Sequence, residues 1–219
     1  MTDEEYRVLE KIKNSIPVCY LADHADFALG IVTGNNKKFL SAEKTENSEM
    51  VLKGTDICKY HINPVKQYLR FEPEQFQQVA PLEIYRAPEK LLYRFISNQL
   101  VVAYDDRQML SLNSCNIVIP KIEGMQIKYI LAILNSSVSQ FVYQKEFHSI
   151  KVLRAHMEHI PIPRVGKAIQ NEIIAMTEPL ICGMGKEAAE TCQKRLDCRI
   201  MDLFRLSAEE QWIIRHALH

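Results

Sequence analysis

The sequence predicts an α+β fold, in which a β-rich body with packed helices is followed by a small C-terminal helical region. Short runs of β-forming residues alternate with turn signals between residues 17 and 120. Apolar residues then recur every three or four positions from 127 to 142, as in a helix packed on a core. The prolines in segment 160–163 separate these parts from a tail of helical pattern.

The chain begins with the pattern of a short amphipathic helix. In residues 3–14 acidic side chains come first, apolar ones follow at helical spacing, and Pro17 comes shortly afterwards. The apolar runs 18–21 and 27–32 are typical of strands. The Thr-Gly-Asn-Asn sequence at 33–36 indicates a turn, so a strand is expected to lead into a polar loop here.

The middle of the chain is predicted to be rich in strands. A short apolar run punctuated by a glycine covers 51–57. Further runs of β-forming residues predict strands at 68–71, 82–86, 100–104 and 115–119. The last two flank a polar tip at 105–108, and they are therefore expected to be core strands.

The Ile-Pro-Ile-Pro segment at 160–163 predicts a domain boundary. Successive prolines remove backbone donors and disfavour helix in the residues before them. We therefore expect one domain at 1–164, whose leading helix lies in 1–16, and a C-terminal helical region at 165–219.

The C-terminal region has the pattern of consecutive helices. Residues 168–180 and 186–206 predict two helices joined by a Cys-Gly-Met-Gly turn. Ser207 and Glu210 have the spacing of a capping box, which predicts the start of a last helix.

Composition excludes several classes of protein. Of the 219 residues 47% are hydrophobic, yet no apolar run approaches the roughly 18 residues that a membrane span needs. The N-terminus does not resemble a signal peptide, and we expect no membrane partner and a cytoplasmic location. The six cysteines include no Cys-x-x-Cys pair, which argues against a zinc ribbon or a redox motif. The net charge is zero, but residues 30–165 contain 17 basic and 13 acidic side chains.

Several polar segments combine the groups that bind phosphates and base edges. The loop from Thr33 to Lys38 offers glycine-turn backbone amides, carboxamides and ammonium groups, although it also fits an ordinary hairpin turn. Aromatic and basic residues alternate around Tyr85, and another basic group surrounds Lys151; an ordinary solvated surface explains these equally well. The candidate nucleic-acid contacts are Thr33, Gly34, Asn35, Asn36, Lys37, Lys38, Lys53, Tyr85, Arg86, Lys90, Arg107, Lys151 and Arg154.

The order of these segments resembles that of a known family. The matching pieces are Gly-Ile-Val-Thr-Gly-Asn-Asn (30–36), Leu-Lys-Gly-Thr-Asp-Ile (52–57), Ala-Pro-Glu-Lys-Leu-Leu (87–92), Ser-Cys-Asn-Ile-Val-Ile (114–119), Tyr-Ile-Leu-Ala-Ile-Leu-Asn-Ser (129–136), Leu-Arg (153–154) and Ile-Pro-Ile-Pro (160–163). Together, over about 17–164, they resemble the TaqI-like C-terminal specificity domain of restriction-modification adenine methyltransferases. The resemblance implies a fold related to the recognition domains of type I specificity subunits.

The resemblance implies a domain that reads double-stranded DNA while other parts of the enzyme act on it. The sequence has neither the glycine-rich loop for S-adenosylmethionine nor the Asn/Asp-Pro-Pro-aromatic loop that holds a flipped adenine. We therefore expect no catalytic residue and no cofactor in this chain. S-adenosylmethionine and Mg²⁺ are expected only in a methyltransferase or endonuclease part, from which this chain is a fragment or a detached subunit.

The sequence leaves three other interpretations open. The chain could serve mainly as a docking module that holds a methyltransferase or nuclease subunit through its C-terminal helices. An unrecognised nuclease would require Asp105, Asp106 and Glu123 to converge on a metal ion. His156 and His159 have the spacing of two metal ligands on one helical face, but no third ligand at suitable spacing accompanies them, and we expect no metal site.

Overall fold

The computed structural model describes residues 1–147 and 149–218, so His148 and His219 lie outside the described residues. The helices are α1 (Asp3–Asn14), α2 (Asn36–Phe39), α3 (Leu82–Tyr85), α4 (Ile127–Asn135), α5 (Ser137–Glu146), α6 (Arg154–Glu158), α7 (Lys167–Ile181), α8 (Lys186–Leu203) and α9 (Ala208–Ala217), with 3₁₀ turns η1 (Gly54–Asp56) and η2 (Pro73–Gln75). The strands are β1 (Val18–Cys19), β2 (Ala25–Ala28), β3 (Leu40–Ser41), β4 (Ser48–Leu52), β5 (Tyr68–Arg70), β6 (Lys90–Arg94), β7 (Val102–Asp105), β8 (Leu110–Ser111), β9 (Cys115–Pro120) and β10 (Ile162–Pro163).

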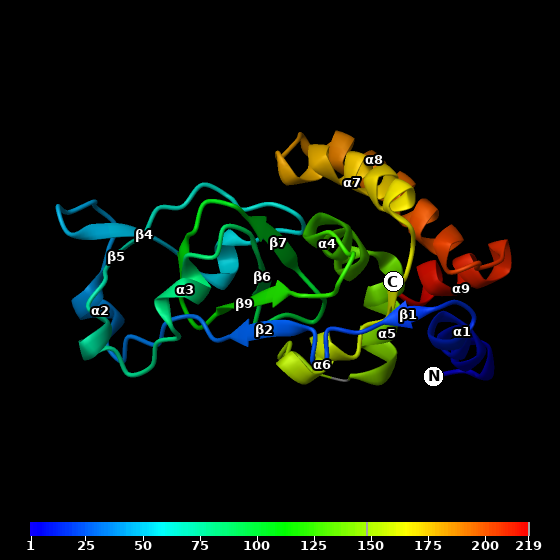
Figure 1. The fold of residues 1–219 in the computed structure, drawn as a ribbon, viewed down its shortest axis with the longest axis horizontal. Helices are drawn as coiled ribbons and strands as arrows, with labels where there is room; N and C mark the ends of the chain where they lie inside the picture. Colours follow the sequence, from blue (N-terminus) through cyan, green and yellow to red (C-terminus); the bar gives the residue numbers. More distant parts are fainter. Residues whose placement is uncertain (148, 219) are drawn as a thin grey trace.

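The molecule is elongated, and its two ends differ in character. One end carries α2, β4 and β5, and the other carries α1, α9 and the N-terminus (Figure 1). The central sheet lies between them, with α4 and α5 beside it and α7 and α8 along one side. The predicted α+β class is confirmed.

The central sheet is antiparallel, with the strand order β2-β9-β6-β7. Leu91 of β6 pairs with Val118 of β9 on one side and with Tyr104 of β7 on the other. The runs at 100–104 and 115–119 form β7 and β9 as predicted, apart from shifted ends. Strand β6 was not predicted, because both of its faces are buried and its sequence therefore lacks the alternation of a half-exposed strand.

A second sheet, in the order β3-β5-β4-β8, extends towards the α2 end. Strands β4 and β8 pair in parallel, and a parallel bridge joins Ile31 to Leu112 just beyond β8. Three segments therefore run side by side in the same direction. Lys53 follows β4, the turn at Asn113 follows Leu112, and the loop at 33–36 follows Ile31. The topology therefore brings three polar chain segments to the same end of the parallel strands.

Two sequence-based assignments were wrong. The run 82–86 forms helix α3 and the following residue, not a strand; Pro81 precedes the helix, and the Tyr85 hydroxyl reaches back to bond Ala80 N at 3.2 Å. The expected single helix at 127–142 is two helices divided at Ser136, whose side chain caps α5. Next to the break, the Asn135 carboxamide bonds both backbone groups of Val102 in β7, at 2.8 and 3.1 Å, which ties the end of α4 to the sheet.

The first helix and the C-terminal helices form where their local sequence patterns predict them. Helix α1 spans Asp3–Asn14 as the acidic first turn predicted. Ser207 and Glu210 form the predicted capping box at the start of α9. Gly183, in the turn between α7 and α8, has a φ of +75°, a conformation that glycine adopts without strain.

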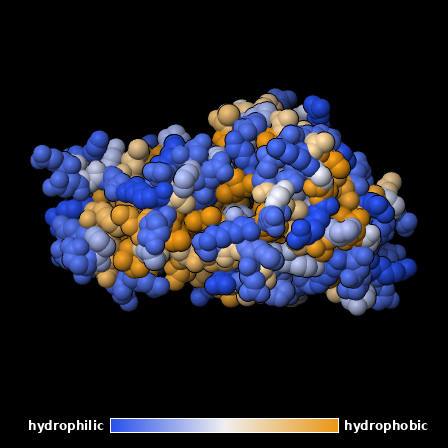
Figure 2. Space-filling model, viewed as in Figure 1, coloured by the Kyte–Doolittle hydropathy of each residue, from blue (hydrophilic) through white to orange (hydrophobic). Residues whose placement is uncertain are grey.

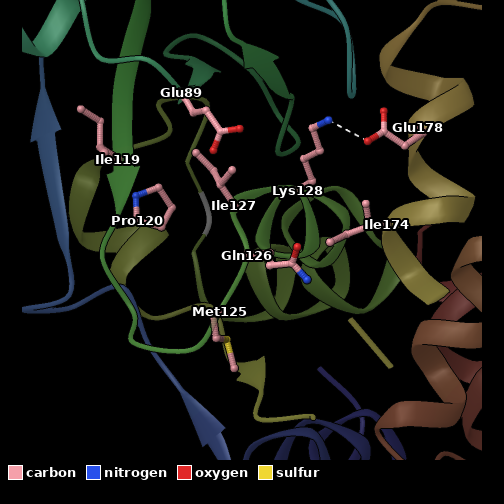
Figure 3. Close-up of a pocket in the computed structure, with 9 residues that line it drawn as sticks. All are labelled: Glu89, Ile119, Pro120, Met125, Gln126, Ile127, Lys128, Ile174 and Glu178. Carbon is pink, nitrogen blue, oxygen red and sulfur yellow. Dashed lines mark hydrogen bonds and ion pairs between the residues drawn. The ribbon is translucent and has the colours of Figure 1, made fainter. Parts of the chain in front are cut away.

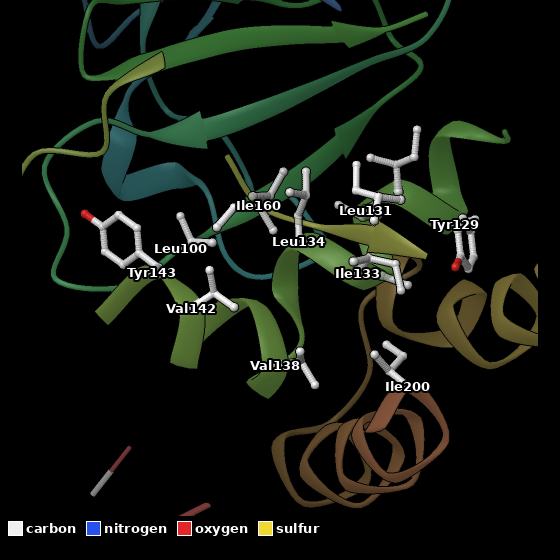
Figure 4. Packing of buried hydrophobic residues seen from close by; sticks show 14 of the residues in the cluster. Leu100, Tyr129, Leu131, Ile133, Leu134, Val138, Val142, Tyr143, Ile160 and Ile200 are labelled. Carbon is white, nitrogen blue, oxygen red and sulfur yellow. The ribbon is translucent and has the colours of Figure 1, made fainter. Parts of the chain in front are cut away.

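One hydrophobic cluster includes residues on both sides of the expected boundary at 164/165. Leu131 and Ile133 of α4 and Val138 of α5 share this cluster with Ile173 of α7 and Ile200 of α8. Figure 4 shows Ile133, Val138 and Ile200 close together in this cluster. In addition, β10 pairs with β1, so the proline segment joins the N-terminal part of the chain. The C-terminal helices are therefore packed on the body, and the boundary itself stays a prediction.

A buried ion pair joins the ends of β6 and β7. The Lys90 ammonium lies 2.6 Å from the Asp105 carboxylate, and neither side chain is exposed to solvent. Lys90 also donates to the Tyr85 carbonyl oxygen at 2.6 Å, and Asp105 accepts from the backbone N–H groups of Arg107 and Met109. The pair therefore ties α3, two central strands and the turn before β8 together.

Replacement of Lys90 by methionine is expected to lower the free energy of unfolding by about 3–5 kcal/mol, because it leaves the Asp105 carboxylate buried without its counter-ion. Urea denaturation measures the loss. The control is Lys121→Met, which breaks the more exposed pair between Lys121 and Asp26; it is expected to cost less than about 1 kcal/mol. Equal losses in the two variants would contradict a structural role for the buried pair.

A second polar contact fastens α8 to the body. Asp197 of α8 accepts hydrogen bonds from the backbone N–H and the hydroxyl of Ser137, both at 2.8 Å, at the first residue of α5. Burial raises the pKa of the Asp197 carboxyl above its ordinary value of 3.8, and the hydrogen bonds from Ser137 oppose this shift.

The raised pKa of Asp197 predicts a pH-dependent contribution to stability. The folded state binds this proton more readily than the unfolded state, so the contribution is largest below the unfolded pKa and is lost as pH rises through the folded pKa. The free energy of unfolding of the wild type minus that of Asp197→Asn should therefore fall as the pH is raised from about 3.5 to about 7. Urea denaturation at several pH values tests this, and a difference that rises with pH would contradict it.

Candidate nucleic-acid interface

The loop from Gly30 to Asn36 is held rigidly at its base. A Cβ atom on Gly30 would lie 2.0 Å from the Leu112 carbonyl oxygen, so only glycine allows this close approach. The Thr33 side chain is buried; its hydroxyl donates to the Asn36 side-chain oxygen at 2.6 Å and accepts from Asn35 N at 3.2 Å. Gly34 has a φ of +74°, in the left-handed region that glycine tolerates.

The predicted loop residues after Thr33 lie on the surface. The Asn35 side-chain oxygen accepts a hydrogen bond from Lys38 N at 3.2 Å, which caps the short helix α2. The side chains of Asn36, Lys37 and Lys38 are exposed. The Lys38 ammonium donates to the Gln75 side-chain oxygen at 2.6 Å, and it lies 4.8 Å from the centre of the Phe39 ring.

A second polar segment, missed by the sequence analysis, lies beside this loop. Val32 and Gln78 exchange two backbone hydrogen bonds, which brings the run Gln75–Gln78 against the loop. Phe76 packs edge-on against Phe39, with ring centroids 5.1 Å apart. The Gln-Phe-Gln-Gln sequence after Pro73 was the signal that could have identified it. We call residues 33–38 and 75–78 together the amide surface.

The amide surface lies at the hydrophilic end of the molecule. Figure 2 shows mainly hydrophilic residues over this outermost end, and hydrophobic patches over the middle of the same face. Glu72 is neutralised by Arg70, at 2.7 Å, and it also accepts a hydrogen bond from Gln75. Glu74 adds an exposed carboxylate to the same turn.

Two other predicted contacts flank a separate hollow. Lys53 lines a depression of about 310 Å³ together with Arg94, Ile96 and Ser114. A backbone bridge joins Ile96 to Lys151, so Lys151 is a neighbour of the same hollow. The side chains of Lys53 and Lys151 are exposed and form no ion pair within the described residues.

The three arginines among the predicted contacts lie elsewhere on the body. Arg86 makes a 2.6 Å ion pair with Glu49 of β4 and donates to the Gln108 carbonyl oxygen at 2.7 Å. Arg107 is exposed in the same turn as Gln108. Arg154 pairs with Glu158 at 2.7 Å and lies over the Phe27 ring.

Two of the predicted contacts are wrong. Lys90 is completely buried in its ion pair with Asp105, so its ammonium cannot reach a phosphate. The Tyr85 ring is also buried, and its hydroxyl is occupied by Ala80 N and the Leu29 carbonyl oxygen. Burial raises the pKa of this phenol, as expected for a core tyrosine.

A larger hollow of about 520 Å³ lies between β9, α4 and α7 (Figure 3). Lys128 and Glu178 form a 2.6 Å ion pair across it, and Glu89 lies on the opposite side. Glu89 accepts a hydrogen bond from the Tyr104 hydroxyl at 2.5 Å. The charged groups that line this hollow are thus already engaged with one another or with the fold.

The structure offers no support for the metal-dependent alternatives. Within 1–147 and 149–218, no group of three or more histidine, cysteine, aspartate or glutamate side chains could hold a metal ion. Asp105 is buried with Lys90, and the His156 ring stacks on Phe147 with centroids 4.4 Å apart. None of the helices described here has both the length and the apolar character needed to span a bilayer.

Comparison with known proteins identifies the family. The family model for the TaqI-like C-terminal specificity domain matches residues 49–162. The chain belongs to this family. The match begins after the Thr33–Lys38 loop, so the role of that loop in this specificity domain stays a prediction. Comparison with curated proteins finds no significant match.

Solved structures of restriction-modification proteins share the fold of this specificity domain. MmeI, a type IIL enzyme in complex with DNA, matches with a TM-score of 0.58 and 10% identity, over 90% of this chain and 35% of that one. A structure of a type I restriction-modification system matches with a TM-score of 0.50 and 14% identity, over 98% of this chain and 51% of that one. The type IIG restriction endonuclease BpuSI matches with a TM-score of 0.50 and 10% identity, over 93% of this chain and 33% of that one. The chain thus spans between a third and a half of these proteins.

Proposed function

We propose that this specificity domain recognises a particular sequence in double-stranded DNA and directs a methyltransferase or endonuclease part outside this chain to it. Membership of the specificity-domain family carries the proposal. The domain itself performs no chemistry and binds no cofactor; S-adenosylmethionine and Mg²⁺ act in the catalytic part. We expect the complete restriction-modification enzyme to act in the cytoplasm.

The polar side chains of the body divide into two roles. Lys37, Lys53, Arg107 and Lys151 are exposed cations without an ion-pair partner in the described part of the chain, and they suit contacts with phosphates. The carboxamides of the amide surface suit the edges of bases in the major groove. Phosphate contacts would supply affinity and orientation, and base contacts would supply sequence preference.

The C-terminal helices favour a second, compatible role in docking the catalytic part. Two hollows lie along α7 and α8. The first is lined by Pro179, Met184, Glu187, Ala188, Thr191, Cys192 and Arg195, and the second by Met176, Lys194, Arg195, Cys198, Arg199 and Asp202. Met184 and Ala188 are exposed there, next to charged side chains. A mixed apolar and charged helix face of this kind is common where proteins associate transiently.

Affinity selection from a randomised duplex pool at two salt concentrations tests DNA recognition. We expect an enriched motif of a few base pairs and a loss of affinity with salt, in which log affinity falls against log salt with a slope of roughly −0.9 for each phosphate contacted. Binding without enrichment would mean that specificity requires the catalytic part. Absence of binding even at low salt would favour the docking role alone.

Replacement of Lys37 and Lys38 by alanine should reduce the slope of log affinity against log salt by roughly 0.9 for each phosphate that the variant no longer neutralises. The enriched motif should stay unchanged, because ammonium–phosphate contacts carry no direct base information. The matched control replaces two exposed lysines of α8, Lys186 and Lys194, and should leave the slope unchanged. Equal slopes for both double variants would exclude the loop from the interface.

A further inference from the structure

We propose that Gln77 reads an adenine in the target site, by pairing its carboxamide with the major-groove edge of that base. This inference rests on the proposed function and deepens it, because it names the base and the residue. Gln77 lies in the centre of the amide surface, between Gln75, which Lys38 contacts, and Gln78, which pairs with Val32.

The Gln77 carboxamide is available for binding. It is exposed, and it has no hydrogen-bond partner among the described residues. Gln75 differs, because its oxygen accepts from Lys38 and its nitrogen donates to Glu72, both at 2.6 Å. The oxygens of Asn35 and Asn36 also each accept a bond within the loop. Gln77 therefore keeps both its donor and its acceptor free, whereas Gln75, Asn35 and Asn36 do not. Gln78 is also exposed without a side-chain hydrogen bond, but it is the Gln77 side chain that lies against Gly34 of the first loop.

The backbone that carries Gln77 is fixed from both sides. Its Cβ atom would lie 3.4 Å from a Cβ built on Gly34, so it rests against the glycine turn of the first loop. The next residue, Gln78, is held by backbone bonds of 2.9 and 3.1 Å with Val32. The preceding residue, Phe76, packs between Phe39 and Phe71. Binding therefore requires ordering of the Gln77 side chain only, which lowers its entropic cost.

The free carboxamide complements adenine better than any other base. Adenine presents the N6 amino donor and the N7 acceptor side by side, and the carboxamide oxygen and NH₂ group can engage both at once. Guanine presents two acceptors at this edge, O6 and N7, so the carboxamide oxygen would face another oxygen. Cytosine and thymine each offer a single polar group there, which permits only one of the two bonds. The exposed Lys37 in the adjoining segment can contact a nearby phosphate without altering this preference.

Selection from a randomised duplex pool with four forms of the full chain tests the assignment. The wild type should enrich a motif with adenine at one position, at which other bases are disfavoured by roughly 5- to 150-fold. Gln77→Ala should lose discrimination at that position alone and keep the salt dependence of the wild type, because no charge is removed. Gln77→Arg should change the preference there to guanine, since a guanidinium donates to both O6 and N7.

Gln99→Ala is the matched control, because Gln99 is another exposed glutamine but lies in the turn before β7, away from the amide surface. Its motif should equal that of the wild type. An unchanged motif in Gln77→Ala and Gln77→Arg, or a wild-type motif without adenine, would overturn the assignment while leaving DNA recognition intact. A wild type that binds DNA but enriches no sequence would mean that this chain does not choose a site by itself, and a wild type that does not bind would remove DNA recognition altogether; either result would overturn the assignment together with sequence recognition by the isolated chain.

Discussion

The arrangement of the body depends on the buried ion pair between Lys90 and Asp105. These residues face each other in the register of β6 and β7, and their charges are fully removed from water. Such a pair is tolerated only where further hydrogen bonds satisfy both groups. Here the extra partners are the Tyr85 carbonyl oxygen and the backbone N–H groups of Arg107 and Met109, so satisfying the charges also fixes the end of α3 and the turn into β8.

Fixing that turn determines where the polar loops lie. Strand β8 follows it directly and pairs in parallel with β4, and the next residue, Leu112, bridges Ile31. The loop after Ile31 in turn holds Gln78 through Val32. A charge pair in the core is thus linked by consecutive backbone contacts to the amide surface. At the other end, Asn135 bonds β7 and Asp197 bonds α5, which attaches the helices to the same sheet.

The features that could be predicted from the sequence are those with local causes. The capping box of Ser207 and Glu210 and the acidic start of α1 depend on residues within one helical turn, and both helices form as expected. Strand β6 and the burial of Lys90 depend on pairing with β7, which no local pattern records. Likewise, the loop residues Thr33–Lys38 were predicted as DNA contacts from their own chemistry, but Gln77 comes to lie beside them only through the tertiary bridge between Val32 and Gln78.

The absence of net charge is consistent with recognition that relies on base contacts. Of the predicted cations on the body, Arg86 and Arg154 are already engaged with Glu49 and Glu158, and Lys90 is buried. The exposed cations that remain can contact only a few phosphates, so the background affinity for arbitrary DNA is expected to be low and sensitive to salt. A low background raises the ratio of specific to non-specific binding that a few base contacts can produce. Neutral carboxamides held on a rigid surface would add discrimination without adding to that background, and this would make them more suitable than further lysines for the proposed choice of a site.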